Sequence, residues 1–128
     1  MNNKVSNSPS FGMALYAPTK KKVARVLGNE IATEFEKVRP TLAKIAEDVD
    51  IYVKPDKAWF EMDHPDCDGF MLYAGKFKSK LDAHMKLLKK LFIEPYRPDS
   101  GYAWARTNDV STLGESLIAK AQKIVSEI

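Results

Sequence analysis

The side chains best suited to chemistry gather in a short acidic segment near the middle of the chain. Four carboxylates and one imidazole fall within eight residues: Glu61, Asp63, His64, Asp66 and Asp68. Such groups can bind iron, manganese or magnesium. The spacing matches no established metal-binding loop, and Asp, Pro and Gly are also the residues that turns between strands require. The segment is therefore predicted to be a turn, with a weak iron or divalent-metal site at residues 61–68 as an alternative.

A series of lysines follows this acidic segment: Lys76, Lys78, Lys80, Lys86, Lys89 and Lys90. Residues 76–97 carry seven basic and two acidic groups, whereas residues 49–75 carry two basic and six acidic groups. Basic side chains can contact phosphates, and each contact adds a salt-dependent contribution to nucleic-acid affinity. The simpler interpretation is a solvated helix face. Binding of nucleic acid or a protein partner through residues 76–90 is the alternative.

Two aromatic residues and one basic residue occupy alternate positions of a later strand candidate, at Tyr102, Trp104 and Arg106. Aromatic rings beside arginines can stack on nucleic-acid bases or anchor a protein interface. More often such a strand packs its rings against a helix. These residues join the lysines as candidates for binding nucleic acid or a partner.

No complete set of catalytic groups is found. The order of elements around Pro65-Asp66 resembles the core of the PD-(D/E)xK nucleases, which also need an acid and a lysine on the next strand. The run GFMLYAGK holds no acid, so this activity is rejected. Cys67 has no base at a fixed spacing, and His84 is expected to pack at the edge of the core. The prediction is a non-enzymatic binding or accessory domain with no identified cofactor, ligand or partner.

The length of 128 residues suits one domain. Residues 1–10 are polar and predicted to be a flexible tail, and residues 11–128 the single domain. No apolar run approaches 18 residues, and no secretory signal is recognised, so we expect a cytoplasmic protein that does not enter a membrane.

Alternating apolar residues predict five strand segments, which are Phe11–Ala17, Ile51–Lys54, Ala58–Met62, Gly69–Gly75 and Tyr102–Arg106. The segment 55–57 is predicted to be a turn. With the helices described next, the order is β-α-β-β-β-α-β-α. The predicted fold class is α+β, with an antiparallel sheet of four to five strands and helices packed mainly on one face.

Apolar residues at steps of three and four predict the helices. The first covers residues 20–38, is interrupted at Gly28-Asn29 and ends before Pro40, which can begin another helix. A capping box at residues 79–82 opens a helix whose buried stripe is expected to be Leu81, Met85, Leu88 and Phe92. Residues 77–85 also alternate, so a strand stays possible there. A capping box at residues 112–115 opens the last helix, with the stripe Leu113, Leu117, Ala121, Ile124 and Ile128.

Three segments resemble the YdhG-like domains, which are small bacterial α+β domains, some of them linked to iron handling. The segments are residues 47–55, residues 70–78 and residues 113–125. The likeness covers roughly residues 31–128 and lies in the order of the segments and their general residue pattern. The aromatic-Lys-Asn-His stretch of the family is replaced here by residues 77–80, and residues 11–17 have no counterpart. The resemblance therefore implies a fold and transfers no functional residue.

Overall fold

The structure is a computed structural model, which describes residues 14–57, 68–93 and 101–128. These residues form four helices and a four-stranded sheet with the strand order β2-β3-β4-β5. Along the chain the elements are β2 (Leu15–Tyr16), α1 (Lys20–Leu27), α2 (Asn29–Ile45), β3 (Asp50–Asp56), β4 (Gly69–Gly75), α3 (Lys80–Ile93), β5 (Tyr102–Arg106) and α4 (Val110–Ser126). The α+β class is confirmed.

The sheet is mixed, which corrects the prediction of an antiparallel sheet. β3 and β5 both run antiparallel to β4, but β2 and β3 are parallel. The chain between β2 and β3 passes through α1 and α2, and a helical crossover of this kind returns the chain in the same direction. Only the connections on either side of β4 produce the expected reversal.

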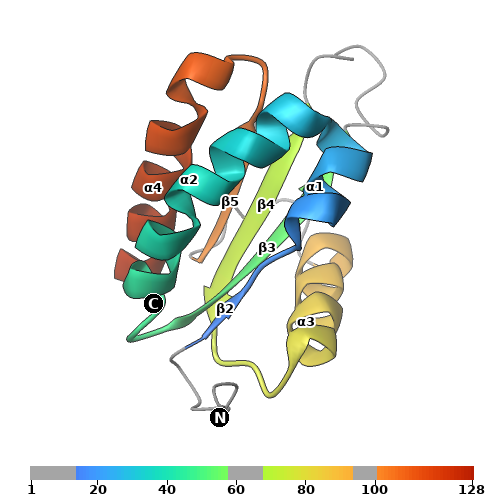
Figure 1. Ribbon diagram of the computed structural model, residues 1–128. Helices are drawn as coiled ribbons and strands as arrows, with labels where there is room; N and C mark the ends of the chain where they lie inside the picture. The colour runs from blue at the N-terminus through green and yellow to red at the C-terminus, as the bar shows by residue number, and fades with distance from the viewer. Residues whose placement is uncertain (1–13, 58–67, 94–100) are drawn as a thin grey trace, which may run out of the picture.

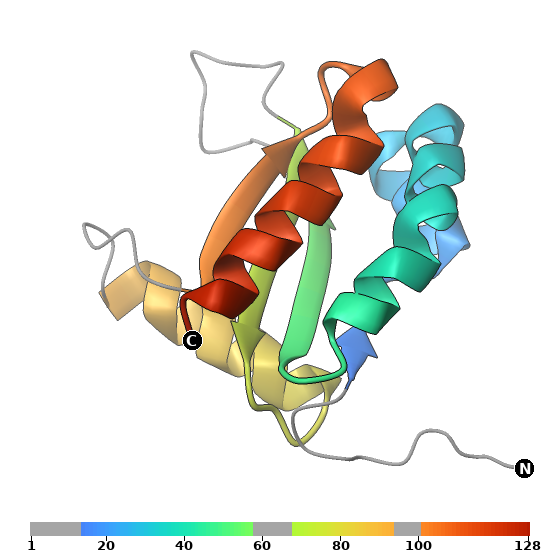
Figure 2. The same ribbon diagram turned by 90° about the vertical axis from the view of Figure 1, so that its left-hand side faces the viewer.

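The main core lies between the sheet and three helices. α1, α2 and α4 cover one face, and α3 lies on the other (Figures 1 and 2). The core is built from side chains that alternate along the strands and recur along the helices: Val23, Phe35, Leu42, Ile51, Val53, Phe70, Leu72, Leu113, Leu117 and Ile124. Phe35 of α2 stacks on Phe70 of β4, with the ring centroids 4.9 Å apart. The prediction that helices pack mainly on one face agrees with this arrangement.

Gly28 separates α1 from α2, as predicted, and its φ of 102° is a conformation that favours glycine. The prediction that α2 ends before Pro40 is wrong, because the helix continues to Ile45. A proline inside a helix costs about 3 kcal/mol through a lost hydrogen bond and a clash. Burial of Val38 and Leu42 on either side of the exposed Pro40 offsets this cost.

The strands β4 and β5 occupy the predicted segments. β3 extends through Pro55 and Asp56, so the turn predicted at residues 55–57 is wrong for these two positions. β2 ends opposite Tyr52. On the edge of β3 that pairs with β2, Pro55 therefore has no partner strand among the described residues, and proline tolerates such an edge position. The predicted strand at residues 58–62 lies outside the described residues, as do residues 11–13.

Residues 80–85 are helical, so the helix and not the alternative strand forms there. The cap is close to the predicted one: Ser79 Oγ accepts from the Asp82 amide at 3.1 Å, and Asp82 Oδ2 accepts from the Lys78 amide at 2.8 Å. The predicted buried stripe is wrong, since Leu81 and Met85 are 69% and 56% exposed. The helix instead buries Ala83 and Leu87 against the sheet. Small Ala83 lets α3 approach a face already filled by aromatic rings.

α4 buries the predicted residues Leu113, Leu117, Ala121 and Ile124, while Ile128 is 61% exposed. The predicted cap at Thr112 is wrong. The cap is Asp109, three residues earlier, and its side chain accepts from the Ser111 amide at 3.1 Å as the helix begins at Val110. Asp109 and Thr112 are both suitable capping residues, and the earlier one lengthens the helix by three residues, which is less than one turn.

Candidate nucleic-acid interface

The sheet face that carries α3 presents a row of tyrosines. Tyr16, Tyr52, Tyr73 and Tyr102 are register partners, one from each strand. Because alternate residues of a strand share a face, all four point to the α3 side. Tyr52 is buried and the other three are half-buried. The row was missed in the sequence, where each strand shows a single tyrosine and the register between strands cannot be seen.

A second row lies beside the tyrosines, formed by Lys54, Met71 and Trp104. Gly69 and Arg106 are paired just beyond it. A Cβ atom placed on Gly69 would clash with the Ala105 carbonyl oxygen and lie 3.1 Å from Cε2 of Trp104, so the close approach of the β5 backbone requires glycine here. Trp104 is half-buried and Arg106 is exposed. The predicted site residues of β5 therefore share one face, next to the row of tyrosines.

The lysines predicted from the sequence lie on the same side of the molecule. Lys90 places its Nζ atom 5.6 Å from the ring centroid of Tyr73, the register partner of Tyr102. Lys86 lies 5.9 Å from the ring of Phe77 and forms an ion pair of 3.2 Å with Asp82. The remaining lysines of the series are exposed: Lys76, Lys78, Lys80 and Lys89. The structure thus brings cations of α3 and aromatic rings of the sheet together.

His84 joins α3 to this face. Its Nδ1 atom is hydrogen-bonded to the Tyr52 hydroxyl at 3.0 Å. Burial lowers the pKa of His84, and so do the charges of Lys54, Lys22 and Lys80. Burial also raises the pKa of Tyr52. Lysines from β3, α1 and α3 therefore surround one imidazole, and two of them, Lys22 and Lys54, were not among the predicted site residues.

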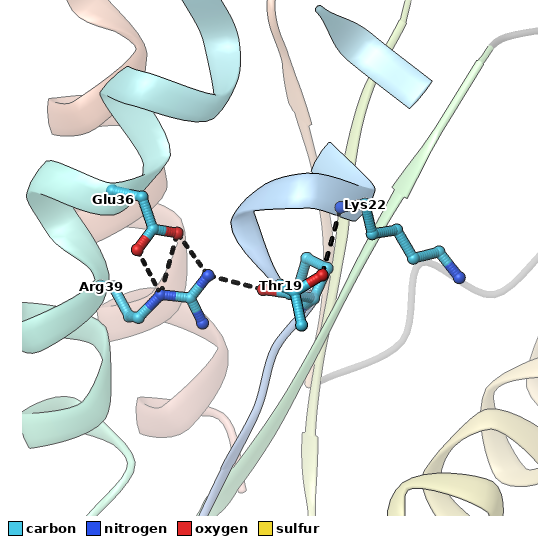
Figure 3. A network of polar contacts seen from close by, with 5 residues as sticks. Thr19, Lys22, Glu36 and Arg39 are labelled. Atoms are coloured by element: carbon cyan, nitrogen blue, oxygen red, sulfur yellow. Dashed lines mark hydrogen bonds and ion pairs between the residues drawn. The ribbon is translucent and has the colours of Figure 1, made fainter. Parts of the chain in front are cut away.

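A polar network holds the start of α1, where Lys22 lies (Figure 3). The Thr19 hydroxyl accepts from the Lys22 amide at 3.1 Å and caps the helix. Arg39 of α2 donates to the Pro18 carbonyl at 2.6 Å and also pairs with Glu36. α2 thereby fixes the end of α1 that carries three consecutive lysines, residues 20–22. Cations at a helix N-terminus oppose the helix dipole, and a bound anion relieves that repulsion.

Asp50 is the buried charged residue of the described chain, with no exposed surface. Its Oδ1 atom accepts from the Ala14 amide at 2.9 Å, and its Oδ2 atom accepts from the Phe77 amide at 2.8 Å. The carboxylate therefore ties the segment before β2 to the segment between β4 and α3. This is a structural role, because both oxygens are used by backbone groups.

Of the predicted metal ligands, only Asp68 belongs to the described residues; Glu61, Asp63, His64 and Asp66 lie outside them. The Asp68 carbonyl accepts from the amide and the hydroxyl of Thr107, at 2.9 and 3.0 Å. Within residues 14–57, 68–93 and 101–128, no group of three His, Cys, Asp or Glu side chains could hold a metal ion. The metal site at residues 61–68 stays a prediction.

Comparisons of the chain with protein-family models, with curated proteins and with solved structures find no match. The resemblance to YdhG-like domains accordingly stays a prediction. None of the helices in the described part of the chain has the length and apolar character needed to span a bilayer. The proposals that follow rest on the geometry of the chain itself.

Proposed function

We propose that this protein is a non-enzymatic binding domain. It binds single-stranded nucleic acid on the α3 side of its sheet. The observation that carries the proposal is the grouping of Tyr73, Tyr102 and Trp104 on one face, with Lys90 over the Tyr73 ring. Proteins that bind single strands combine aromatic rings for stacking with cations along the phosphate path. A cytoplasmic location is part of the same proposal.

The three rings pack at the edge of the smaller core cluster under α3 and keep part of their surface open for stacking. They are half-buried, whereas the rings of Phe35 and Phe70 on the opposite face have no exposed surface. A base stacked on an aromatic side chain contributes about 1–3 kcal/mol with little dependence on its sequence. Two neighbouring rings on β5 and one on β4 therefore suit consecutive bases of a flexible strand.

The charges near these rings favour a polyanion. α3 carries four lysines and one acid, Asp82, whose carboxylate is already bound by Lys86 and the Lys78 amide. Contacts from Lys89, Lys90 and Arg106 would place cations on either side of the stacked bases. Each phosphate contact to a single strand adds about 0.7 to the slope of log affinity against log salt concentration.

The test is fluorescence anisotropy of a labelled 12-nucleotide oligouridine with the full chain at a series of salt concentrations. We expect a salt slope of about −2 for three phosphate contacts. The double variant Lys89→Glu/Arg106→Glu should weaken binding at least tenfold. Lys44→Glu/Lys123→Glu is the matched control, because it changes the net charge equally at two exposed lysines of α2 and α4, and it should change affinity less than twofold.

Two results would refute the proposal. One is no change in anisotropy at 20 mM salt and 100 μM protein. The other is an equal loss of affinity in the control and the double variant, which would mean that overall charge and not this face governs binding. Competition with unlabelled duplex tests the stacking component: a duplex that competes as well as the single strand contradicts a role for the rings.

A further inference from the structure

The helix α3 has a second apolar stripe that faces away from the sheet. Leu81 and Met85 are 69% and 56% exposed, and Leu88 is half-buried. These residues are separated by steps of four and three, the spacing of a seam that packs against another helix. On the opposite side of the same helix, Ala83 and Leu87 are buried against the sheet. α3 is therefore apolar on two sides, and only one of them is covered by described residues.

Positive charge surrounds this outer stripe. Lys78, Lys80 and Lys89 are exposed, and none of them forms an ion pair within the described part of the chain. Asp82 is the acid of this helix, and its carboxylate is engaged by Lys86 and the Lys78 amide. A partner that covers the stripe must therefore bring negative charge to its margins.

We propose that the outer stripe of α3 docks an acidic amphipathic helix of a partner protein. Its apolar side chains would pack on Leu81, Met85 and Leu88, and its carboxylates would face Lys80 and Lys89. A second copy of this chain is a poorer occupant, because two α3 helices placed face to face would oppose the same lysines. The proposal thus commits to a helical partner of opposite charge.

This surface shares only Lys89 with the one proposed for nucleic acid, and its apolar residues belong to neither the stacking rings nor the phosphate contacts. Lys90 lies over the Tyr73 ring, on the side of α3 that faces β4. At 100° per residue, Met85 is about 140° around the helix from Lys90. Loss of docking on the stripe should therefore leave oligouridine binding unchanged, and the two proposals can fail separately.

The test uses the full, isotope-labelled chain and two synthetic helical peptides. One peptide has leucines at steps of three and four flanked by glutamates, and the other has lysines in place of the glutamates. We expect the acidic peptide to shift the amide signals of Leu81, Met85 and Leu88, and the basic peptide to shift none. Absence of shifts at 1 mM acidic peptide would overturn the proposal, and so would equal shifts with both peptides.

The double variant Leu81→Ser/Met85→Ser should weaken binding of the acidic peptide at least tenfold. Ile128→Ser is the matched control, since Ile128 is 61% exposed at the end of α4, and it should change affinity less than twofold. Two further measurements address other occupants. A dimer in sedimentation that the double variant abolishes would overturn the proposal in favour of a second copy of the chain. Binding to phosphatidylglycerol vesicles without binding to the peptide would overturn it in favour of a lipid surface.

Discussion

The two faces of the sheet differ in chemistry although they share the same strands. The face toward α2 and α4 is lined by aliphatic and phenylalanine side chains, which form one continuous core cluster. The face toward α3 holds a row of tyrosines, the buried carboxylate of Asp50 and the imidazole of His84. A core built only for stability needs no hydroxyls. The comparison indicates that the first face maintains the fold, while the second positions polar groups near the surface.

Charge does not follow this division, because α1 and α2 cover the same face of the sheet and differ in their balance of charge. α2 neutralises much of its own charge through Lys37–Glu34, at 2.8 Å, and Arg39–Glu36. α1 and the segment from Lys76 to Lys90 hold an excess of cations instead. Surface ion pairs contribute little to stability, so the excess has more consequence for what the molecule attracts than for how firmly it folds.

The largest expected effect compares how much each face of the sheet contributes to the free energy of unfolding. Phe70→Ala should lower the free energy of unfolding by about 3–5 kcal/mol, because it removes a fully buried ring stacked on Phe35. Leu87→Ala on the α3 side should cost about 2–3 kcal/mol, since fewer buried side chains surround it. Urea denaturation measures both. An equal or larger loss for Leu87→Ala would mean that the α3 face is as much a stabilising core as the other.

The next effect concerns the buried carboxylate. Asp50→Asn should cost about 1–3 kcal/mol, because the amide group cannot accept from both the Ala14 and Phe77 backbone amides. Hydrogen exchange at these two amides should become faster than at neighbouring positions. Asp48→Asn is the control, exposed two residues earlier, and should stay within about 0.5 kcal/mol. Unchanged exchange at Ala14 and Phe77 would contradict the role of Asp50.

A smaller effect links pH to the α3 face. The pKa of His84 is lowered in the folded protein, first by burial and then by nearby lysines, so the unfolded chain binds more protons around pH 6. Stability should therefore be fully present above pH 6.5 and decrease as the pH falls below it, and His84→Gln should remove this component. Nucleic acid bound to the lysines should raise the pKa of His84, as measured by NMR titration. An unchanged pKa in the complex would place the ligand elsewhere.

The smallest effect belongs to the surface of α2. The hydrogen bond from Arg39 lowers the pKa of Glu36, so its contribution to stability is present above the unfolded value and lost as the pH falls through the lower folded value. Glu36→Gln should cost less than about 1 kcal/mol at pH 7 and nothing at pH 2. Thermal unfolding at the two pH values measures it. A larger cost would show that the Pro18–Arg39 connection depends on Glu36.

Local patterns in the sequence predicted the elements better than their partners. β4 and β5 were predicted at their observed bounds because alternation and flanking glycines are local signals. The parallel pairing of β2 with β3 was missed because it depends on the return path through two helices. The α3 stripe was wrong because Leu81 and Ala83 belong to competing apolar stripes, and tertiary packing chooses between them. The lysines and the β5 aromatic residues were named as binding candidates, which stays a prediction, and the row of tyrosines exists only in the folded register.

The carboxylate of Asp50 also has a kinetic consequence. Its two amide donors are 36 and 27 residues away along the chain, on opposite sides of it. Each oxygen needs its own loop to close, and both loops must close before the carboxylate is fully satisfied, so we expect the pair of bonds to be completed after the rate-limiting step of folding. We expect Asp50→Asn to accelerate unfolding and to leave the refolding rate nearly unchanged in stopped-flow measurements. The Asp50 side chain would then determine the unfolding rate, and so the lifetime of the native state, without changing the folding rate.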